Sequence, residues 1–299
     1  MTQHENIVTI AAECGLDIQP ESITINESGL DFQVAFAEDR HGVEWVLRIP
    51  RRPEVYERTD SEKETVDFIQ QHVSFEVPNW QIHKETLIAY PKLTGVPAAT
   101  IDPELQQYVW EIEHKPVPQN FIDTLAEVLV DLHRITDDEL VSSEIKTTTI
   151  QQIKQDYQER MHKVKETFGV SPDLWNRWQK WLDRDELWPN HVTMIHGDLH
   201  PGHIMVDKEA NVTGLIDWTE ASHADPSNDF MGHHRVFGDE GLDDLIEAYD
   251  KAGGKTWPHM KEHIIELNAV FPMFIAEFAI ASGEAAYEKM AKKELGVEE

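Results

Sequence analysis

The stretch MIHGDLHPGHIMVD, Met194 to Asp207, gathers histidines and aspartates around a Pro-Gly break. Three of them, His196, His200 and His203, have the side-chain type that binds zinc. The intervening glycine and proline residues deny these histidines a common helical face, and the chain's single cysteine offers no cluster to assist them. A zinc cage is therefore the weaker interpretation of the stretch.

The order of the residues favours a different chemistry. Asp198 is followed five positions later by His203, and Asp217 comes after a short predicted hairpin, in GLIDW. Kinase-type phosphoryl transfer uses this order: the first carboxylate accepts the proton of the attacking hydroxyl, and the later two side chains hold metal against the nucleotide phosphates. Taken singly, each aspartate is explained by a turn or a helix cap. Their co-occurrence in this order favours phosphoryl transfer.

A second metal pattern lies in HMKEH, where His259, Glu262 and His263 match the H-x-x-E-H order of one zinc-peptidase class. Patterns of this length recur by chance, and no third ligand is evident. An exposed polar helix face is the favoured interpretation, and a zinc peptidase remains a remote alternative.

The composition excludes several classes of partner. The 299 residues carry 56 acidic and 26 basic side chains, a formal charge of -30, whereas phosphate-backbone binding needs a basic surface. We therefore expect no nucleic acid partner. No run approaches the roughly 20 apolar residues of a membrane span, and the start of the chain does not resemble a signal peptide. With one cysteine, Cys14, these features predict a cytoplasmic protein that has no membrane partner.

The elements that must position these residues change character along the chain. The first ninety residues hold β-branched and aromatic runs bounded by turns, which predict an antiparallel sheet, and one amphipathic helix over 59–73. Beyond them helical periodicity dominates, as in PQNFIDTLAEVLVDLHRI. The sequence thus predicts an α+β fold with a small lobe over 1–92, which would bind nucleotide, and a larger helical lobe over 93–299.

The small lobe offers residues for the other half of such a site. In NESGLDFQV, Ser28 and Gly29 lie in a turn between two strands, where backbone amides would cover phosphates, although an ordinary hairpin explains the turn equally well. WVLRIP places Arg48 on a strand where kinase-type folds carry a lysine. The following helix offers Glu62 as its ion-pair partner, with Glu64 as an alternative.

Together these motifs resemble the aminoglycoside phosphotransferase superfamily, which has a bilobal protein-kinase-like fold, and more closely its macrolide 2′-phosphotransferase branch. The resemblance covers nearly the whole chain: NESGLDFQV, WVLRIPRRP, IAYPKLTG, HGDLHPGHIMVD and GLIDWTEASHADPSNDF follow in order. The wider superfamily usually has asparagine at the position of His203, and histidine there is a feature of the macrolide branch. An aminoglycoside, choline or sugar kinase of the same superfamily is the main alternative, because the acidic charge also suits a polycationic acceptor.

The resemblance implies transfer of the γ-phosphoryl group of GTP to the 2′-hydroxyl of a macrolide antibiotic, which inactivates the drug. Asp198 would be the catalytic base, and His203 and Asp217 the ligands of Mg²⁺, with Mn²⁺ possible because imidazole is a softer ligand than Mg²⁺ usually selects. The connector LIAYPKL would present its backbone to the base through Tyr90, Pro91, Lys92 and Leu93, with Tyr90 narrowing the space for an adenine amino group.

A macrolide is large and apolar and carries one dimethylamino cation, so its site should combine apolar side chains with an acidic partner. The carboxy-terminal stretch AVFPMFIAEFAIA supplies both, although helix core is the favoured explanation of any single apolar residue. The predicted acceptor residues are Phe271, Met273, Phe274, Glu277 and Phe278. His196 is predicted to brace the loop that holds Asp198, and Asp229 to act as a helix cap or loop brace beside it.

Overall fold

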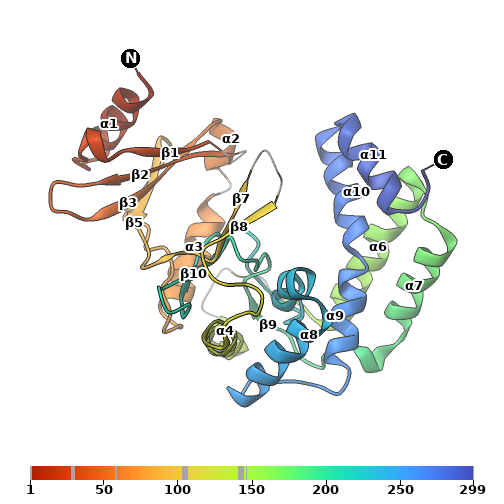
Figure 1. Ribbon diagram of the computed structural model, residues 1–299. Coiled ribbons are helices and arrows are strands. Elements are labelled where there is room, and N and C mark those ends of the chain that lie inside the picture. Colours follow the sequence, from red (N-terminus) through yellow and green to blue (C-terminus); the bar gives the residue numbers. More distant parts are fainter. Residues whose placement is uncertain are drawn as a thin grey trace. The chain divides into compact units, whose positions relative to one another are not determined.

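The computed structural model describes residues 2–27, 31–57, 59–102, 107–140, 145 and 147–298. The chain divides into two compact units, which are described separately (Figure 1). Unit 1 comprises Met1–Asp131 and Pro201–Ala221, and unit 2 comprises Leu132–Val141, Ile145–His200 and Ser222–Glu299, with the undescribed residues inside these ranges left aside. The predicted lobe boundary after residue 92 follows the change from strands to helices, whereas the units group residues by packing, so that boundary remains a prediction.

Unit 1 is built on a five-stranded antiparallel sheet in the order β1-β2-β3-β5-β4, as the strand runs predicted. Its strands are β1 (Thr24–Asn26), β2 (Phe32–Glu38), β3 (Glu44–Pro50), β4 (Ile82–Lys84) and β5 (Leu87–Pro91). The further elements of unit 1 are α1 (Gln3–Glu13), η1 (Pro20–Ser22), α2 (Pro53–Tyr56), α3 (Thr59–Gln70), β6 (Val96–Pro97), β7 (Ala99–Asp102), β8 (Gln107–Trp110), β10 (Ile204–Val206) and β11 (Val212–Leu215). Helix α4 (Gln119–His133) begins in unit 1 and ends in unit 2.

The period of two along the strands gives the sheet two different faces. On one face Leu47 and Ala89 pack under Ile7 of α1, and this core is apolar throughout. On the other face the alternate residues, Val46 and Tyr90 among them, form a second cluster with Ile88, Trp80, Leu93 and Met205. Arg48, two residues beyond Val46 on β3, belongs to this second face, so the sheet presents its functional candidates opposite α1.

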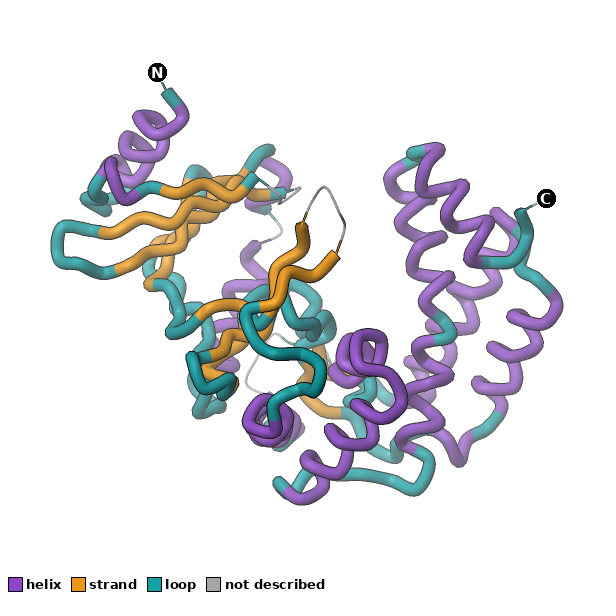
Figure 2. The backbone as a smooth tube through the Cα atoms, viewed as in Figure 1, coloured by secondary structure: helices purple, strands orange, loops and turns teal. Residues whose placement is uncertain are grey.

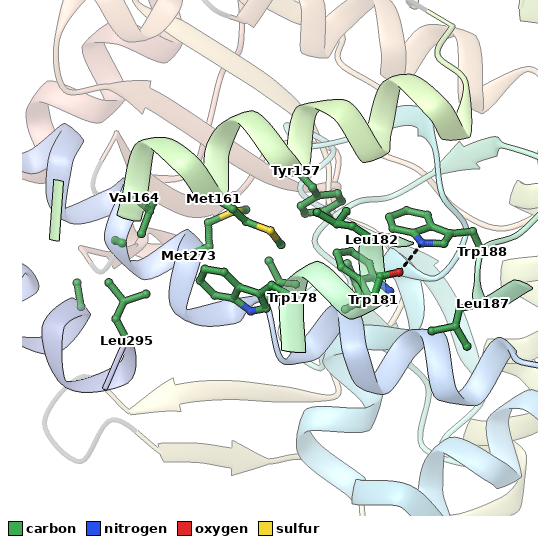
Figure 3. Packing of buried hydrophobic residues seen from close by; sticks show 14 of the residues in the cluster. Tyr157, Met161, Val164, Trp178, Trp181, Leu182, Leu187, Trp188, Met273 and Leu295 are labelled. Carbon is green, nitrogen blue, oxygen red and sulfur yellow. Dashed lines mark hydrogen bonds between the residues drawn. The ribbon is translucent and has the colours of Figure 1, made fainter. Parts of the chain in front are cut away.

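Unit 2 consists mainly of helices (Figure 2). They are α5 (Asp137–Leu140), α6 (Ile150–Phe168), α7 (Pro172–Asp183), η2 (Asp185–Leu187), α8 (Asn228–Lys251), α9 (Met260–Asn268), α10 (Phe271–Ser282) and α11 (Ala285–Glu294), with the short strands β9 (Thr193–Ile195) and β12 (Ser222–Ala224). The core of unit 2 stacks Trp181 on Trp188, whose indole N–H donates to the Trp181 carbonyl at 3.2 Å (Figure 3). The predicted α+β class, a small antiparallel sheet followed by a larger helical part, is confirmed.

The stretch Met260–Ser282 is long and apolar enough to cross a membrane by length and composition, contrary to the sequence-based expectation. It folds as two helices rather than the single helical segment expected, because Pro272 lies in the first turn of α10, where its missing N–H costs nothing. Leu267, Val270 and Met273 are fully buried in the core of unit 2. Packing inside a globular unit thus accounts for the apolar character of these buried positions.

Candidate active site

The hairpin β10–β11 brings two of the predicted metal ligands together within unit 1. The strands pair from Ile204 to Leu215, and the Ile216 N–H extends the pairing by donating to the His203 carbonyl at 3.0 Å. His203 Nε2 then lies 3.6 Å from an Asp217 carboxylate oxygen. The hairpin expected between these two residues is therefore present, and it explains why positions fourteen residues apart are neighbours.

The donor atoms of His203 and Asp217 suit a shared metal ion. Two ligand atoms at about 2.1 Å from one ion lie roughly 3–3.6 Å apart for bond angles between a right angle and 120°. The Asp217 side chain is about half exposed, and its other oxygen accepts the Thr219 hydroxyl at 3.0 Å. The chemistry and spacing of the pair thus fit a divalent ion, although its role as a metal site stays a prediction.

Asp217 also has an uncommon backbone conformation, with φ at +65°. Left-handed conformations cost free energy in residues other than glycine and occur often at functional sites. The following Trp218 is buried and donates its indole N–H to the Leu215 carbonyl at 3.1 Å, which fixes the turn. The aspartate is therefore held at the end of β11 by its neighbours rather than by regular strand geometry.

Arg48 and Glu62 form the predicted ion pair, with α3 supplying the glutamate. Two parallel hydrogen bonds of 2.6 and 3.1 Å join the guanidinium to the carboxylate, and both side chains are largely buried. The Arg48 guanidinium also lies over the Phe32 ring, 4.3 Å from its centroid. Burial disfavours the charged guanidinium, but Glu62 outweighs this and raises the pKa of Arg48. Glu62 rather than Glu64 is the partner.

Tyr90 lies on the same face of the sheet as Arg48. Burial raises the pKa of its hydroxyl to about 12, with Glu62 and Asp217 acting in the same direction and Arg48 opposing them. Asp217 likewise favours the charged form of Arg48. Ile216, next to Asp217, and Phe32, over which the Arg48 guanidinium lies, both pack against the cluster that holds Tyr90. The ion pair, the connector and the end of β11 therefore share one region of unit 1.

The rest of the predicted connector lies beside Tyr90. Pro91 ends β5, Leu93 is buried in the second cluster, and the Lys92 N–H donates to the Glu44 carbonyl at 2.8 Å. The predicted phosphate-covering residues Ser28 and Gly29 lie outside the described residues.

In unit 2, the Asp229 carboxylate is hydrogen-bonded to the loop that holds Asp198, beside which the sequence predicts a helix cap or loop brace. The carboxylate accepts the backbone N–H groups of His196 at 2.9 Å and Gly197 at 2.8 Å. It also lies 3.1 Å from Nε2 of His133, whose other ring nitrogen lies 2.9 Å from the Tyr249 hydroxyl. Burial opposes ionisation of Asp229, but these donors outweigh it and lower its pKa. Asp229 is therefore a buried, charged acceptor for the loop.

The loop itself is arranged around the exposed Asp198. The His196 ring is fully buried, and its Nδ1 accepts the Asp198 N–H at 3.3 Å; this contact fits the brace role of His196, which stays a prediction. Helix α8 approaches the loop closely at Gly232, where an added Cβ would lie only 2.1 Å from the Leu199 carbonyl oxygen. Backbone contacts on both sides thus fix the loop while the Asp198 side chain faces solvent.

The zinc-peptidase alternative is wrong. His263 is fully buried, with Nε2 at 2.7 Å from Asp225 and Nδ1 accepting the Trp181 indole N–H at 3.1 Å. Both ring nitrogens are therefore engaged, and Glu262 is paired with Arg184. The favoured interpretation, an exposed polar helix face, is wrong for His263, whose buried ring packs against Trp188, while the His259 and Glu262 side chains are about half exposed.

The predicted acceptor residues on α10 do not form one exposed surface. Met273 is fully buried in the core, and both carboxylate oxygens of Glu277 accept from Arg160 at 2.8 and 2.7 Å, so these two predictions need correction. Phe271 lies against the Arg235 guanidinium and Phe274 packs on the core, which leaves only Phe278 substantially exposed. Sequence periodicity identified the helix but not the partners that α6 and α8 supply.

The sequence was compared with protein-family models and with curated proteins. A model of the phosphotransferase enzyme family matches residues 22–263. A Bacillus subtilis (strain 168) protein, described as uncharacterized protein YcbJ, is 45% identical over 291 residues, which are 97% of this chain and 95% of that protein.

Solved structures agree with this assignment. A macrolide 2′-phosphotransferase type I is 34% identical, with a TM-score of 0.88, and the apoenzyme of macrolide 2′-phosphotransferase MphH from Brachybacterium faecium is 32% identical, with a TM-score of 0.91. Both matches cover 99% of this chain and 98% of the other. A GDP and kanamycin complex of an aminoglycoside phosphotransferase shares the fold at 15% identity, with a TM-score of 0.74 over 98% of this chain and 97% of that one.

Proposed function

The chain belongs to the phosphotransferase enzyme family, and from this premise we propose that it transfers the γ-phosphoryl group of GTP to the 2′-hydroxyl of a macrolide antibiotic. The observation that carries the acceptor assignment is the likeness to two macrolide 2′-phosphotransferases over 99% of the chain, at 34% and 32% identity. The fold likeness to aminoglycoside enzymes, at 15% identity, carries no such weight for their acceptors. His203 at the position of the usual asparagine supports the same assignment.

In the proposed reaction the 2′-hydroxyl oxygen of the acceptor forms a bond to the γ-phosphorus of GTP, and the bond between that phosphorus and the leaving oxygen of GDP breaks. Asp198 accepts the proton of the 2′-hydroxyl. Its exposure leaves the carboxylate accessible, and the Asp229 brace fixes the backbone beside it. Such a transition state is loose, so positioned charge rather than a strong nucleophile supplies the rate enhancement. The acceptor hydroxyl therefore needs only a base held in the correct place.

His203 and Asp217 would hold a divalent ion, which when bound neutralises charge on the nucleotide phosphates. Arg48, kept charged by Glu62, would pair with the phosphates, as a strand lysine does in protein kinases. The partly buried Phe32, which packs against the Tyr90 cluster, would offer an apolar surface for the guanine base. Residues 90–93 would offer to its edge the backbone groups that the sheet leaves free, since the Lys92 N–H is paired with the Glu44 carbonyl. In this proposal the metal ion and the Arg48 guanidinium bind the phosphates of GTP, and the connector binds its base.

The test is a turnover assay with purified protein, GTP or ATP, and erythromycin, kanamycin or choline as acceptor. We expect GDP release that depends on erythromycin, and phosphorylated drug identified by mass spectrometry at the 2′ position. Turnover with kanamycin or choline and none with erythromycin would overturn the macrolide assignment.

Asp198→Ala tests the base in the same assay. It should abolish transfer while GTP binding, measured by calorimetry, is retained. A variant that still turns over at the wild-type rate would refute the role of Asp198.

A further inference from the structure

A short strap after α3 (residues 74–76) joins three parts of unit 1 that are distant in sequence. The Glu76 N–H donates to the Thr213 carbonyl at 3.0 Å, and the Leu215 N–H donates to the Glu76 carbonyl at 3.0 Å, so the strap runs parallel to β11. Gly214 permits this approach, because a Cβ there would lie 2.5 Å from the Glu76 carbonyl oxygen. The strap therefore fits against β11 only with glycine at this position.

The Glu76 side chain reaches the connector on its other side. One carboxylate oxygen accepts the Thr94 N–H at 2.6 Å, and the other accepts the Thr94 hydroxyl at 2.7 Å. The Thr94 carbonyl in turn accepts the Thr213 hydroxyl at 2.8 Å. Strap, connector and β11 are thus linked pairwise in a closed set of hydrogen bonds.

The three linked segments each lead directly to a candidate site residue. Thr94 follows Leu93, the last residue of the predicted base-binding connector, and β11 ends two residues before Asp217. The strap itself follows α3, which carries Glu62. The next connector residue, Gly95, is also closely packed, since a Cβ there would lie 2.2 Å from the Val206 carbonyl oxygen of β10.

Resting on the proposed function, we propose that Glu76 is a positioning residue that holds the nucleotide-base connector in register with the strand that ends at the metal ligand Asp217. It touches neither nucleotide nor metal. It sets the distance between the segments that bind the two ends of the nucleotide, and this distance decides whether base and phosphates are engaged together.

A carboxylate is the side chain that this role requires. Both groups of Thr94 that point at Glu76 are donors, and an ionised carboxylate offers an acceptor to each of them. A glutamine can keep both contacts only as neutral hydrogen bonds, with its oxygen on the Thr94 N–H and its NH₂ group on the Thr94 hydroxyl oxygen. Glu76→Gln therefore removes the charge from the bridge while keeping the size of the side chain.

The experiment measures GTP binding by calorimetry in Glu76→Gln, Thr94→Val and Thr94→Ser proteins, with Mg²⁺ present and acceptor absent. We expect about a threefold to tenfold weaker Kd in Glu76→Gln, because binding must then restore a register that the exposed charged pair holds in the free protein. Binding should stay near wild type in Thr94→Ser, which keeps both donors. Thr94→Val, which removes one of the two contacts, should weaken binding less in the Glu76→Gln background than in the wild type. Glu85→Gln, an exposed glutamate in the β4–β5 turn, is the matched control.

A second readout separates positioning from simple stabilisation. The Mg²⁺ concentration for half-maximal turnover should rise in Glu76→Gln, while the KM for the acceptor stays within about twofold. Lower thermal stability with unchanged GTP binding and unchanged Mg²⁺ dependence would overturn the proposal. Because GTP binding is measured without acceptor, failure of the macrolide assignment would leave the expected Kd change intact.

Discussion

Replacing Asp229 by Asn tests the brace of the catalytic loop with the smallest change in shape. One oxygen of Asp229 accepts from His196 and His133, and the other from Gly197. If the asparagine oxygen takes the first position, its NH₂ group faces the Gly197 N–H and that hydrogen bond is lost. The reverse orientation loses two. The wild-type structure therefore predicts at least one missing charge-assisted bond, which leaves one partly buried N–H unsatisfied.

The expected loss of unfolding free energy is about 1–3 kcal/mol, because the lost bond and the N–H that it leaves unsatisfied are one event, which costs about this much. The same change frees the backbone immediately before Asp198, so kcat should fall by about tenfold to a hundredfold. The GTP Kd should change little, because the proposed nucleotide residues belong to unit 1. Urea denaturation and steady-state kinetics measure the two quantities.

Asp244→Asn provides the control, since it makes the same substitution at an exposed position of the same helix, α8. It should change the unfolding free energy by less than about 0.5 kcal/mol. If Asp229→Asn behaved like this control in both assays, the reasoning that the carboxylate positions the loop would be refuted.

Three further outcomes are expected. Arg48→Ala leaves the buried Glu62 carboxylate unpaired, so urea denaturation should show a loss of about 3–5 kcal/mol, and a loss below about 1 kcal/mol would contradict a buried pair. His203→Asn replaces imidazole by an amide oxygen, so the ratio of turnover with Mg²⁺ to turnover with Mn²⁺ should rise, and an unchanged ratio would argue against metal binding by His203. Burial lowers the pKa of His233 to about 4 from 6.5, so the unfolded chain binds the additional proton between these values. The unfolding free energy should therefore fall by about 3 kcal/mol from pH 6.5 to pH 4 in the wild type and by clearly less in His233→Gln; parallel curves would contradict the shift.

Hydrophobic periodicity and turn residues predicted those features of the structure whose interacting residues lie close together in the sequence. The runs of β-branched and aromatic residues predicted the strands of the sheet, and the order of Arg48 before Glu62 predicted an ion pair between β3 and α3. The turn residues after MIHGDLHPGHIMVD predicted the hairpin that brings His203 close to Asp217. For the ion pair and the β10–β11 hairpin the decisive neighbours lie within about fifteen residues, where strand period and turn chemistry limit the possible arrangements, whereas the pairing of β3 with β5 joins distant segments.

Partners from distant segments could not be predicted in the same way. Glu277 was expected to meet a ligand cation, but Arg160 lies 117 positions away and takes both of its oxygens. Tyr249 and His133, which support the Asp229 brace, carried no motif that singled them out. Met273 is likewise buried by residues of α6 and α7. The hydrophobic period of α10 alone does not show which other helices pack against it.

Because Gly232 has no side chain, the distance between α8 and the loop is set by backbone atoms alone. Since α8 meets the Leu199 carbonyl where a methyl group would stand, the distance between helix and loop is the shortest that van der Waals contact allows. Any relative with a larger residue here must carry a displaced loop or a displaced helix. Glycine at position 232 therefore allows α8 and the loop to approach as closely as they do. In a related chain, glycine at this position indicates that the loop can have the same geometry, and a larger residue indicates that it cannot.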